Sequence, residues 1–395
     1  MKKILLVILI LFLFILLQNK TYAKPNTTEK YNTSEDTNEI IENQKDTLNI
    51  SDFLKESQDY TKDVMPGINL NDLLTAAITG TVDNVKIIHA FLNIFGKEFV
   101  NSLTIITSII VIIVIHGILK SISEELGNSG VSQIAYYVQY ILIVTIVMGS
   151  FADIVLMVKT SIQNLVSFIN MLVPILITLL ITTGSITTAG TIQPLILFLT
   201  TIIGNFIVNV AIPITLVSAA LGIISQISDK LQIDKLAKFL KSGTVWALGV
   251  ILTIFVGVAS LESSLTSQVD GISAKTTKAA VSSFIPVIGK ILGDAVETVM
   301  GCSIILKNAL GIVGVIVVIG ICITPIVKLL TLMTMYYLCS ALCQPIADGK
   351  IVKLLAHIGD TYKLLLAILC SVSVMLIIGI TIVIKMSNTG VLSWL

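Results

Sequence analysis

No charged side chain occurs from Thr160 to Ser228, a run of 69 residues. In a soluble domain about one residue in four is charged, so a run of this length is not expected in water. A helix needs about 20 apolar residues to cross a bilayer, and this run is long enough for two or three crossings. The sequence therefore predicts a membrane protein. Its spans are helices, because the apolar residues do not alternate with polar ones as they do in barrel strands.

The N-terminus has the layout of a secretory signal peptide. A basic start, Lys2 and Lys3, precedes an apolar core at residues 4–17, and small residues end at Ala23. These are the three parts of a cleavable signal, although a first membrane anchor is the alternative. We interpret residues 1–23 as a signal peptide, which places the mature N-terminus outside the cytoplasm.

The region after the signal divides into two parts. Residues 24–65 are polar and rich in Asn, Thr, Glu and Asp, and predict a disordered arm. Residues 66–98 predict a pair of extracytoplasmic amphipathic helices with a break at Gly80, because their apolar residues recur at helical spacing. Residues 24–98 hold thirteen acidic and seven basic side chains, and this shortage of positive charge fits export. The helices either lie on the outer membrane face or form a docking surface for an extracytoplasmic partner.

The remaining chain, residues 99–395, predicts a polytopic membrane domain of about seven or eight helical segments. Together with the exported helical region this gives an all-α fold in contact with the lipid bilayer. Besides the segment around residues 282–301, the expected spans are 99–119, 134–158, 165–183, 194–224, 245–261, 310–342 and 364–384.

The membrane domain contains two segments that resemble each other. Pro174 and Pro213 are 39 residues apart, and so are Pro286 and Pro325. Each second proline is followed by a basic amphipathic segment, "DKLAKFLKSG" or "GKIVKLLAHIG", and then by a span. This arrangement suggests an internal duplication, which many transporters use to form a substrate path.

Motifs for catalysis and nucleotide binding do not occur in the sequence. It has no HExxH, no GxSxG and no GxxxxGK[ST] phosphate loop, so we expect no enzyme, no cofactor and no ATPase activity of its own. All 25 basic residues are Lys and none forms a basic patch with aromatic side chains, which argues against nucleic-acid binding. We expect packing rather than disulfide or metal roles for the cysteines, Cys302, Cys322, Cys339, Cys343 and Cys370, because all lie in apolar segments.

A charged stripe interrupts the apolar sequence near residue 290. Lys290, Asp294 and Glu297 are spaced i, i+4, i+7 and would share one face of a helix, where Lys290 can pair with Asp294. Exposure of this stripe to lipid is excluded by its cost. The segment is therefore either an interfacial or re-entrant helix with its stripe in water, or a span whose stripe faces a polar cavity.

A second candidate lies inside the long uncharged run. Thr201, Asn205 and Asn209 are four residues apart and share one helical face, which we call the Asn face. Polar side chains at membrane depth either line a path or hydrogen-bond to a neighbouring helix. Both interpretations remain open from the sequence.

Three stretches resemble a known family. "FIPVIGKILGDAVETVMGCSIILKNALGIVG", "NMLVPILITLLITTG" and "QPLILFL" are similar to the stage III sporulation protein AE family of endospore-forming Firmicutes. The resemblance implies a part of the mother-cell-encoded, secretion-like complex in the membrane around the engulfed forespore. It also implies two protein partners, a secretion-type ATPase and a forespore-side protein across the intermembrane space.

Two functions follow from these observations. In the first, the chain is a membrane subunit of the channel complex between mother cell and forespore, located in the mother-cell-derived outer forespore membrane. In the second, it is an independent secondary transporter with a site between two internal repeats. The few ionisable residues at membrane depth favour the first.

Overall fold

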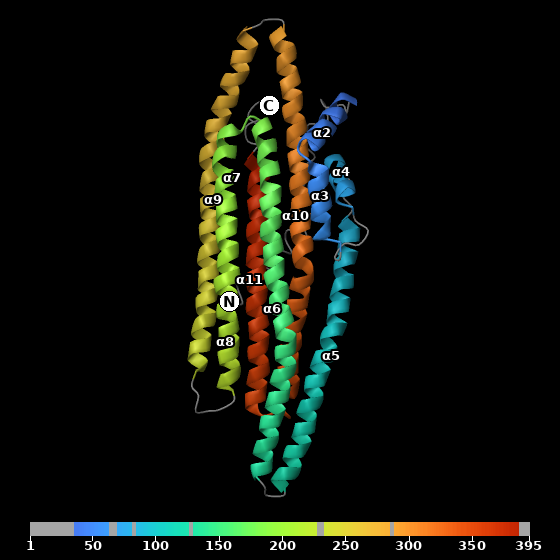
Figure 1. The fold of residues 1–395 in the computed structure, drawn as a ribbon, viewed down its shortest axis with the longest axis vertical. Helices are drawn as coiled ribbons and strands as arrows, with labels where there is room; N and C mark the ends of the chain where they lie inside the picture. The colour runs from blue at the N-terminus through green and yellow to red at the C-terminus, as the bar shows by residue number, and fades with distance from the viewer. Residues whose placement is uncertain are drawn as a thin grey trace.

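The chain forms an elongated bundle of long helices in a computed structural model (Figure 1). Helix is the regular structure throughout the part of the chain that is described, which confirms the predicted all-α polytopic fold. The predicted signal peptide, residues 1–23, lies outside the described residues. The structure describes residues 35–62, 69–80, 84–125, 129–226, 233–284 and 288–386.

Six candidate membrane spans are found within the described residues, and successive ones run in opposite directions (Figure 1). Two long rods, α5 and α6, come first. A third rod is continuous through α7, the π-helical turn η1 and α8, and three more helices follow. The bounds are α5 (Asn84–Glu125), α6 (Ser129–Thr182), α7 (Ile186–Phe206), η1 (Ile207–Ala211), α8 (Ile212–Ser225), α9 (Asp234–Phe284), α10 (Ile288–Cys343) and α11 (Gly349–Met386).

Helix α6 joins what the sequence predicted as two spans, 134–158 and 165–183. Residues 159–164 separate the two predicted spans. They contain neither Gly nor Pro, so nothing in them stops a helix. The Ser161 hydroxyl donates to the carbonyl oxygen of Met157 at 2.8 Å, and this satisfies its polarity within the helix. Similarly, α5 runs from the second predicted amphipathic helix into the first span without a break.

Three short helices precede the long ones and pack at one end of the bundle, which we call the arm end (Figure 1). Disorder was expected over residues 24–65, but the structure has α2 and α3 there. The reason is a short apolar stripe of Ile50, Phe53 and Leu54, which are buried, with the Phe53 ring 5.8 Å from that of Phe168 in α6. The bounds are α2 (Glu35–Thr47), α3 (Ile50–Asp59) and α4 (Leu70–Thr79), and Gly80 ends α4 with φ of 74°.

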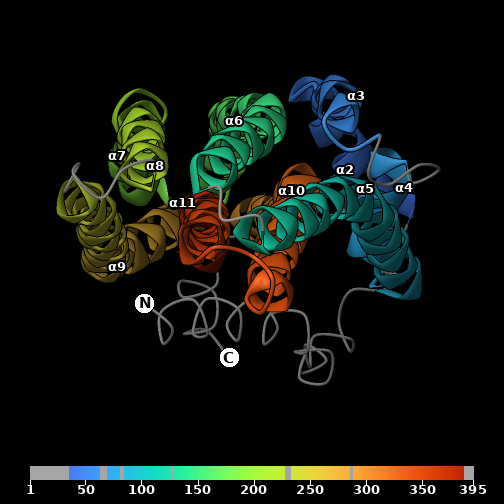
Figure 2. The same ribbon diagram turned by 90° about the horizontal axis from the view of Figure 1, so that it is seen from below.

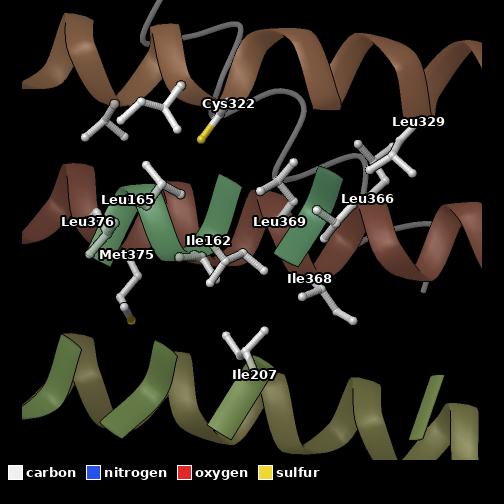
Figure 3. Packing of buried hydrophobic residues seen from close by; sticks show 14 of the residues in the cluster. Ile162, Leu165, Ile207, Cys322, Leu329, Leu366, Ile368, Leu369, Met375 and Leu376 are labelled. Carbon is white, nitrogen blue, oxygen red and sulfur yellow. The ribbon is translucent and has the colours of Figure 1, made fainter. Parts of the chain in front are cut away.

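Helix α11 lies at the centre of the bundle (Figure 2). Its side chains Leu366, Leu369 and Leu376 are buried among residues of α6, α10 and η1 (Figure 3). In the spans of α10 and α11, 67% and 61% of the residues are buried, against 22% in α9 and 19% in α5. The bundle therefore has a covered centre and two uncovered edges.

The apolar helices are too long for one bilayer. The candidate span of α6, Tyr136–Thr182, has 47 residues and includes the charged Asp153 and Lys159, and that of α7–α8, Ile186–Ser225, has 40 residues and no charge. At 1.5 Å per residue these measure about 70 Å and 60 Å. The hydrocarbon layer is about 30 Å thick. The apolar wall of the bundle is thus about twice as tall as the layer that would cover it.

Candidate functional site

Two helical hairpins face each other in the bundle. We call α7, η1, α8 and α9 the first hairpin, and α10 with α11 the second hairpin. The first hairpin lies at one edge of the bundle, with α11 beside α9 (Figure 2). Both hairpins make their turn at the end of the bundle opposite α2–α4, which we call the basic end because Lys235, Lys238 and Lys350 lie there (Figure 1).

An ion pair joins the hairpins near the basic end. Lys241 of α9 places its Nζ 3.0 Å from Oδ2 of Asp360 in α11. The Tyr337 hydroxyl of α10 donates to Oδ1 of Asp360 at 2.6 Å. The Lys241 side chain is 14% exposed and that of Asp360 43%, so the pair is shielded on the lysine side. Pairing offsets the cost of keeping these charges in an apolar bundle.

His357 lies one turn before Asp360 on α11 and faces α8. A β-carbon at Gly222 of α8 would overlap the His357 ring, so only glycine fits there. Nε2 of His357 is buried and has no hydrogen-bond partner among the described residues. A cavity of about 10 Å³ lies beside the ring, with Phe151 and Thr361 in its lining, which is room for about one water.

Lys241, Tyr337, His357 and Asp360 together form what we call the cross-hairpin cluster. A carboxylate held by a lysine and a phenol can exchange a proton with either neighbour or with water. The imidazole can hold a proton or a water in the adjacent cavity. The cluster thus has the chemistry of a proton or ion site, and equally that of a polar lock between two hairpins.

A further lysine is buried at the arm end. Lys307 of α10 has no exposed surface, and its Nζ donates to the carbonyl oxygens of Val383 and Ile384 at 3.3 and 2.8 Å. These carbonyls belong to the last turn of α11, where a cation is favoured by the helix dipole. Lys307 therefore fastens the end of α11 to α10.

The predicted charged stripe, Lys290, Asp294 and Glu297, is on the first turns of α10. Its side chains lie outside those that the structure describes. The backbone continues without a break into the span that begins at Thr298. The last turns of α9 and the first turns of α10 project beyond the rest of the bundle (Figure 1). Whether the stripe faces water or a polar cavity stays a prediction.

The Asn face points away from the bundle. Thr201, Asn205 and Asn209 are all exposed. The residue between them, Gly204, is buried, and a β-carbon there would overlap Val166 of α6. Exposed Phe198 and Ile202 flank the Asn face.

Sequence reasoning did not find the cross-hairpin cluster or Lys307. Lys241 belongs to a segment that the sequence predicts as basic and amphipathic. The spacing within such a segment does not distinguish a lysine that faces the bundle from one that faces water. A signal was present at Asp360, an acidic residue directly after the second basic segment and at the start of an apolar run. Lys307 could have been noticed as a lone cation between long apolar stretches.

Residues 68–387 match the family model for stage III sporulation protein AE. The stage III sporulation protein AE of Bacillus subtilis (strain 168) is 34% identical over 271 residues, which is 69% of this chain and 68% of that protein. No solved structure matches the chain.

Proposed function

Since the chain belongs to the stage III sporulation protein AE family, we propose that it is a membrane subunit of the secretion-like channel complex between mother cell and forespore. Spore development after engulfment would depend on this complex. The proposed location is the mother-cell-derived outer forespore membrane, with α2–α4 in the intermembrane space. The chain itself is a multi-pass membrane protein with a role in sporulation.

The observation that carries the proposal is the height of the apolar wall. Candidate spans of 40 or more residues exceed the hydrocarbon layer by about 30 Å or more. Mismatch costs a fraction of a kcal/mol per Å, and tilting absorbs only part of such an excess. Other proteins covering the uncovered edges would remove this cost. A subunit of a larger assembly fits this requirement better than a transporter that works alone.

The proposed partners follow a division of labour. The sequence has no phosphate loop, so energy from nucleotide hydrolysis would come from a separate secretion-type ATPase at the basic end. A forespore-side protein would meet α2–α4 at the arm end. The exposed side of α3 is polar, with Lys55, Glu56 and Asp59 at its surface.

One observation favours the second function, an independent secondary transporter. The cross-hairpin cluster lies between the two segments that suggest a duplication, which is where such transporters bind substrate. The cavity beside His357 has a volume of about 10 Å³ and would hold a proton or water rather than a solute. If the chain is a transporter, the role that this cluster can support is therefore proton coupling, with Asp360 as the group that binds the proton.

Co-purification from sporulating cells tests the first function. We expect the tagged chain to bring down the ATPase and the forespore-side protein in a stable complex. Asp360→Asn separates the two functions, because it removes the titratable group and keeps the shape. If the chain is a channel subunit, the Asp360→Asn variant should support the same yield of heat-resistant spores as the wild type when both are present in the membrane at the same level. A stable, fully assembled but inactive Asp360→Asn variant would favour the transporter.

Topology is tested with single added cysteines. Ser51→Cys is on the exposed surface of α3, and Gln344→Cys is at the exposed α10–α11 connection, where it serves as the matched control. An impermeant thiol reagent applied to unengulfed cells should label Ser51→Cys and leave Gln344→Cys unlabelled until lysis. The reverse pattern would invert the proposed orientation.

A further inference from the structure

We propose that the Asn face is the contact surface between two copies of this chain in the membrane. The proposal does not depend on the channel complex, because it concerns only the outer wall of the first hairpin. The depth, exposure and hydrogen-bonding chemistry of Asn205 and Asn209 fit a second copy of the chain as the occupant.

The Asn face lies near the middle of the rod formed by α7, η1 and α8. Asn205 is at the middle of the apolar stretch Ile186–Ser225. A layer about 30 Å thick that is centred on this stretch of about 60 Å contains the whole Asn face, because residues 201–209 extend over only about 12 Å. The neighbouring side chains Phe198 and Ile202 are 62% and 48% exposed, so the surroundings are apolar.

Two amides in lipid need a hydrogen-bonding partner from outside the chain. Each Asn side chain has two N–H donors and an oxygen acceptor, and hydrocarbon satisfies neither. The inner side of the same rod packs closely on α6 at Gly204, so the Asn face has no route to the interior. Asparagine is a common interhelical hydrogen-bonding residue between membrane helices.

The backbone of the rod changes at the Asn face. The turn η1, Ile207–Ala211, is π-helical and includes Asn209. Single π-helical turns frequently occur at functional sites. A wider turn also alters the phase of the helix, which sets the direction of Asn209 relative to Asn205.

A second copy is the occupant that fits without further assumptions. Every copy inserts in the same orientation, and closed assemblies have a rotation axis along the membrane normal. Each residue then meets a neighbouring copy at its own depth. An amide is complementary to itself, because its donor faces an acceptor of the same kind. A different protein would need its own polar residues at this depth.

Cysteine cross-linking tests the proposal with the full chain expressed alone in membranes of a non-sporulating host. Asn205→Cys, treated with a mild oxidant, should form a disulfide-linked product of twice the chain mass. Leu156→Cys is the control, since Leu156 is 63% exposed on α6, away from the Asn face. The wild-type chain, with its five native cysteines, gives the background.

Affinity gives a second, quantitative readout. The double variant Asn205→Val, Asn209→Val should weaken self-association in bilayers about tenfold by energy transfer, equivalent to about 1.4 kcal/mol. The double variant Asn205→Gln, Asn209→Gln keeps the amide groups and should lose less of the self-association affinity. Folding is checked by the helical signal of the same samples.

Two results would overturn the proposal. One is cross-linking of Asn205→Cys that does not exceed that of Leu156→Cys. The other is rapid labelling of Asn205→Cys by a water-soluble thiol reagent, which would mean that the Asn face lines an aqueous path. Neither result bears on the channel complex, which is tested by co-purification.

Discussion

The two hairpins share one framework. Pro174, which precedes the first hairpin and lies in α6, and Pro286, which precedes the second, differ by 112 positions, and so do Pro213 and Pro325 within the hairpins. The same offset carries Lys238 and Lys241 of the first hairpin onto Lys350 and Lys353 of the second, and each lysine pair lies near the basic end. Both hairpins run in the same direction through the bundle (Figure 1). These correspondences support the internal duplication suggested by the proline spacing, which stays a hypothesis.

The two hairpins differ in what covers them. At the same offset, exposed Thr201, Asn205 and Asn209 correspond to buried Val313, Val317 and Ile321. The second helices show the same contrast. Phe239, Trp246 and Ile254 of α9 are 72%, 73% and 53% exposed, and their counterparts Ile351, Ile358 and Leu366 of α11 are buried.

This contrast teaches that polarity follows the environment rather than the framework. The second hairpin carries valine and isoleucine where its neighbours in the chain cover it. At the Asn face the first hairpin carries hydroxyl and amide groups at the equivalent places, where nothing in the described chain covers it, whereas the exposed places of α9 are apolar. A face that had only lipid to meet would be expected to keep the apolar side chains.

Exchanging equivalent residues between the two hairpins should have the largest effect on the free energy of unfolding. Val317→Asn places an amide in a position with no exposed surface, where nothing is arranged to bond it. We expect a loss of about 3 kcal/mol in the free energy of unfolding, from an unsatisfied amide and lost packing. Detergent-induced unfolding, followed by the helical circular dichroism signal, measures it.

The matched control is the opposite exchange, Asn205→Val. In detergent at low protein concentration it should change the free energy of unfolding by less than about 0.5 kcal/mol, because the residue is exposed. Equal losses for Val317→Asn and Asn205→Val would mean that the two positions are equally covered, and the comparison would fail.

Breaking the link between the hairpins should have the next largest effect. Lys241→Met leaves Asp360 with only the Tyr337 hydroxyl, and we expect a loss of about 2 kcal/mol, below the range for fully buried pairs because Asp360 is 43% exposed. Adding Asp360→Leu should recover part of the loss. A double variant as unstable as the sum of the two single ones would show that the pair has no coupling energy.

Much of this fold could be predicted from the sequence, for physical reasons that are visible in particular residues. Long apolar runs predicted a helical membrane protein, and Gly80 marked the end of α4 because it adopts a left-handed backbone conformation. The join within α6 was not predicted, since the apolar pattern between the two predicted spans is interrupted by Lys159, Thr160, Ser161, Gln163 and Asn164. Helix propensity and the hydrogen bond of Ser161 keep them helical.

The cross-hairpin cluster could not be predicted in the same way. Lys241 and Asp360 are far apart in the sequence, and no local pattern states that α9 and α11 are neighbours. The charged stripe and the Asn face were visible because their members share one helix, where spacing alone defines a face. Local periodicity therefore predicted which residues share a helical face. The Lys241–Asp360 pair could be identified only from the packing of the two hairpins.

The close approach of the hairpins at Gly222 should show a smaller effect. Gly222→Ala places a methyl group against the His357 ring, which must turn away. We expect a loss of about 1–2 kcal/mol, in the range for overpacked sites that can partly adjust. Combining Gly222→Ala with His357→Ala should remove most of the steric cost. Thermal unfolding in detergent is the measurement, and an unchanged midpoint for Gly222→Ala would contradict the close contact.

The smallest effect on stability is expected where α10 has charges and the corresponding residues of α6 have hydroxyls. At the offset of 112, Lys290 and Asp294 correspond to Thr178 and Thr182. The Thr178 hydroxyl donates to the carbonyl oxygen of Pro174 at 2.9 Å and needs no partner elsewhere. The charges of the second hairpin can instead satisfy each other across one turn of α10.

Reversing one of these charges, as in Lys290→Glu, should lower the yield of heat-resistant spores more than reversing both, because only the double exchange restores opposite charges. The pair is worth about 0.5 kcal/mol if its face is in water, so the effect on unfolding should be small and should shrink at high salt. The variant Lys290→Thr, Asp294→Thr copies the corresponding residues of α6, Thr178 and Thr182. If the polar groups of the stripe need only partners within their own helix, this variant should give the same yield of heat-resistant spores as the wild type. A defect in both the threonine variant and the charge exchange, at normal membrane levels, would mean that a partner recognises these charges individually. The second hairpin would then bind a partner through its charged stripe. The contrast between a covered second hairpin and an uncovered first hairpin would apply only to their apolar parts.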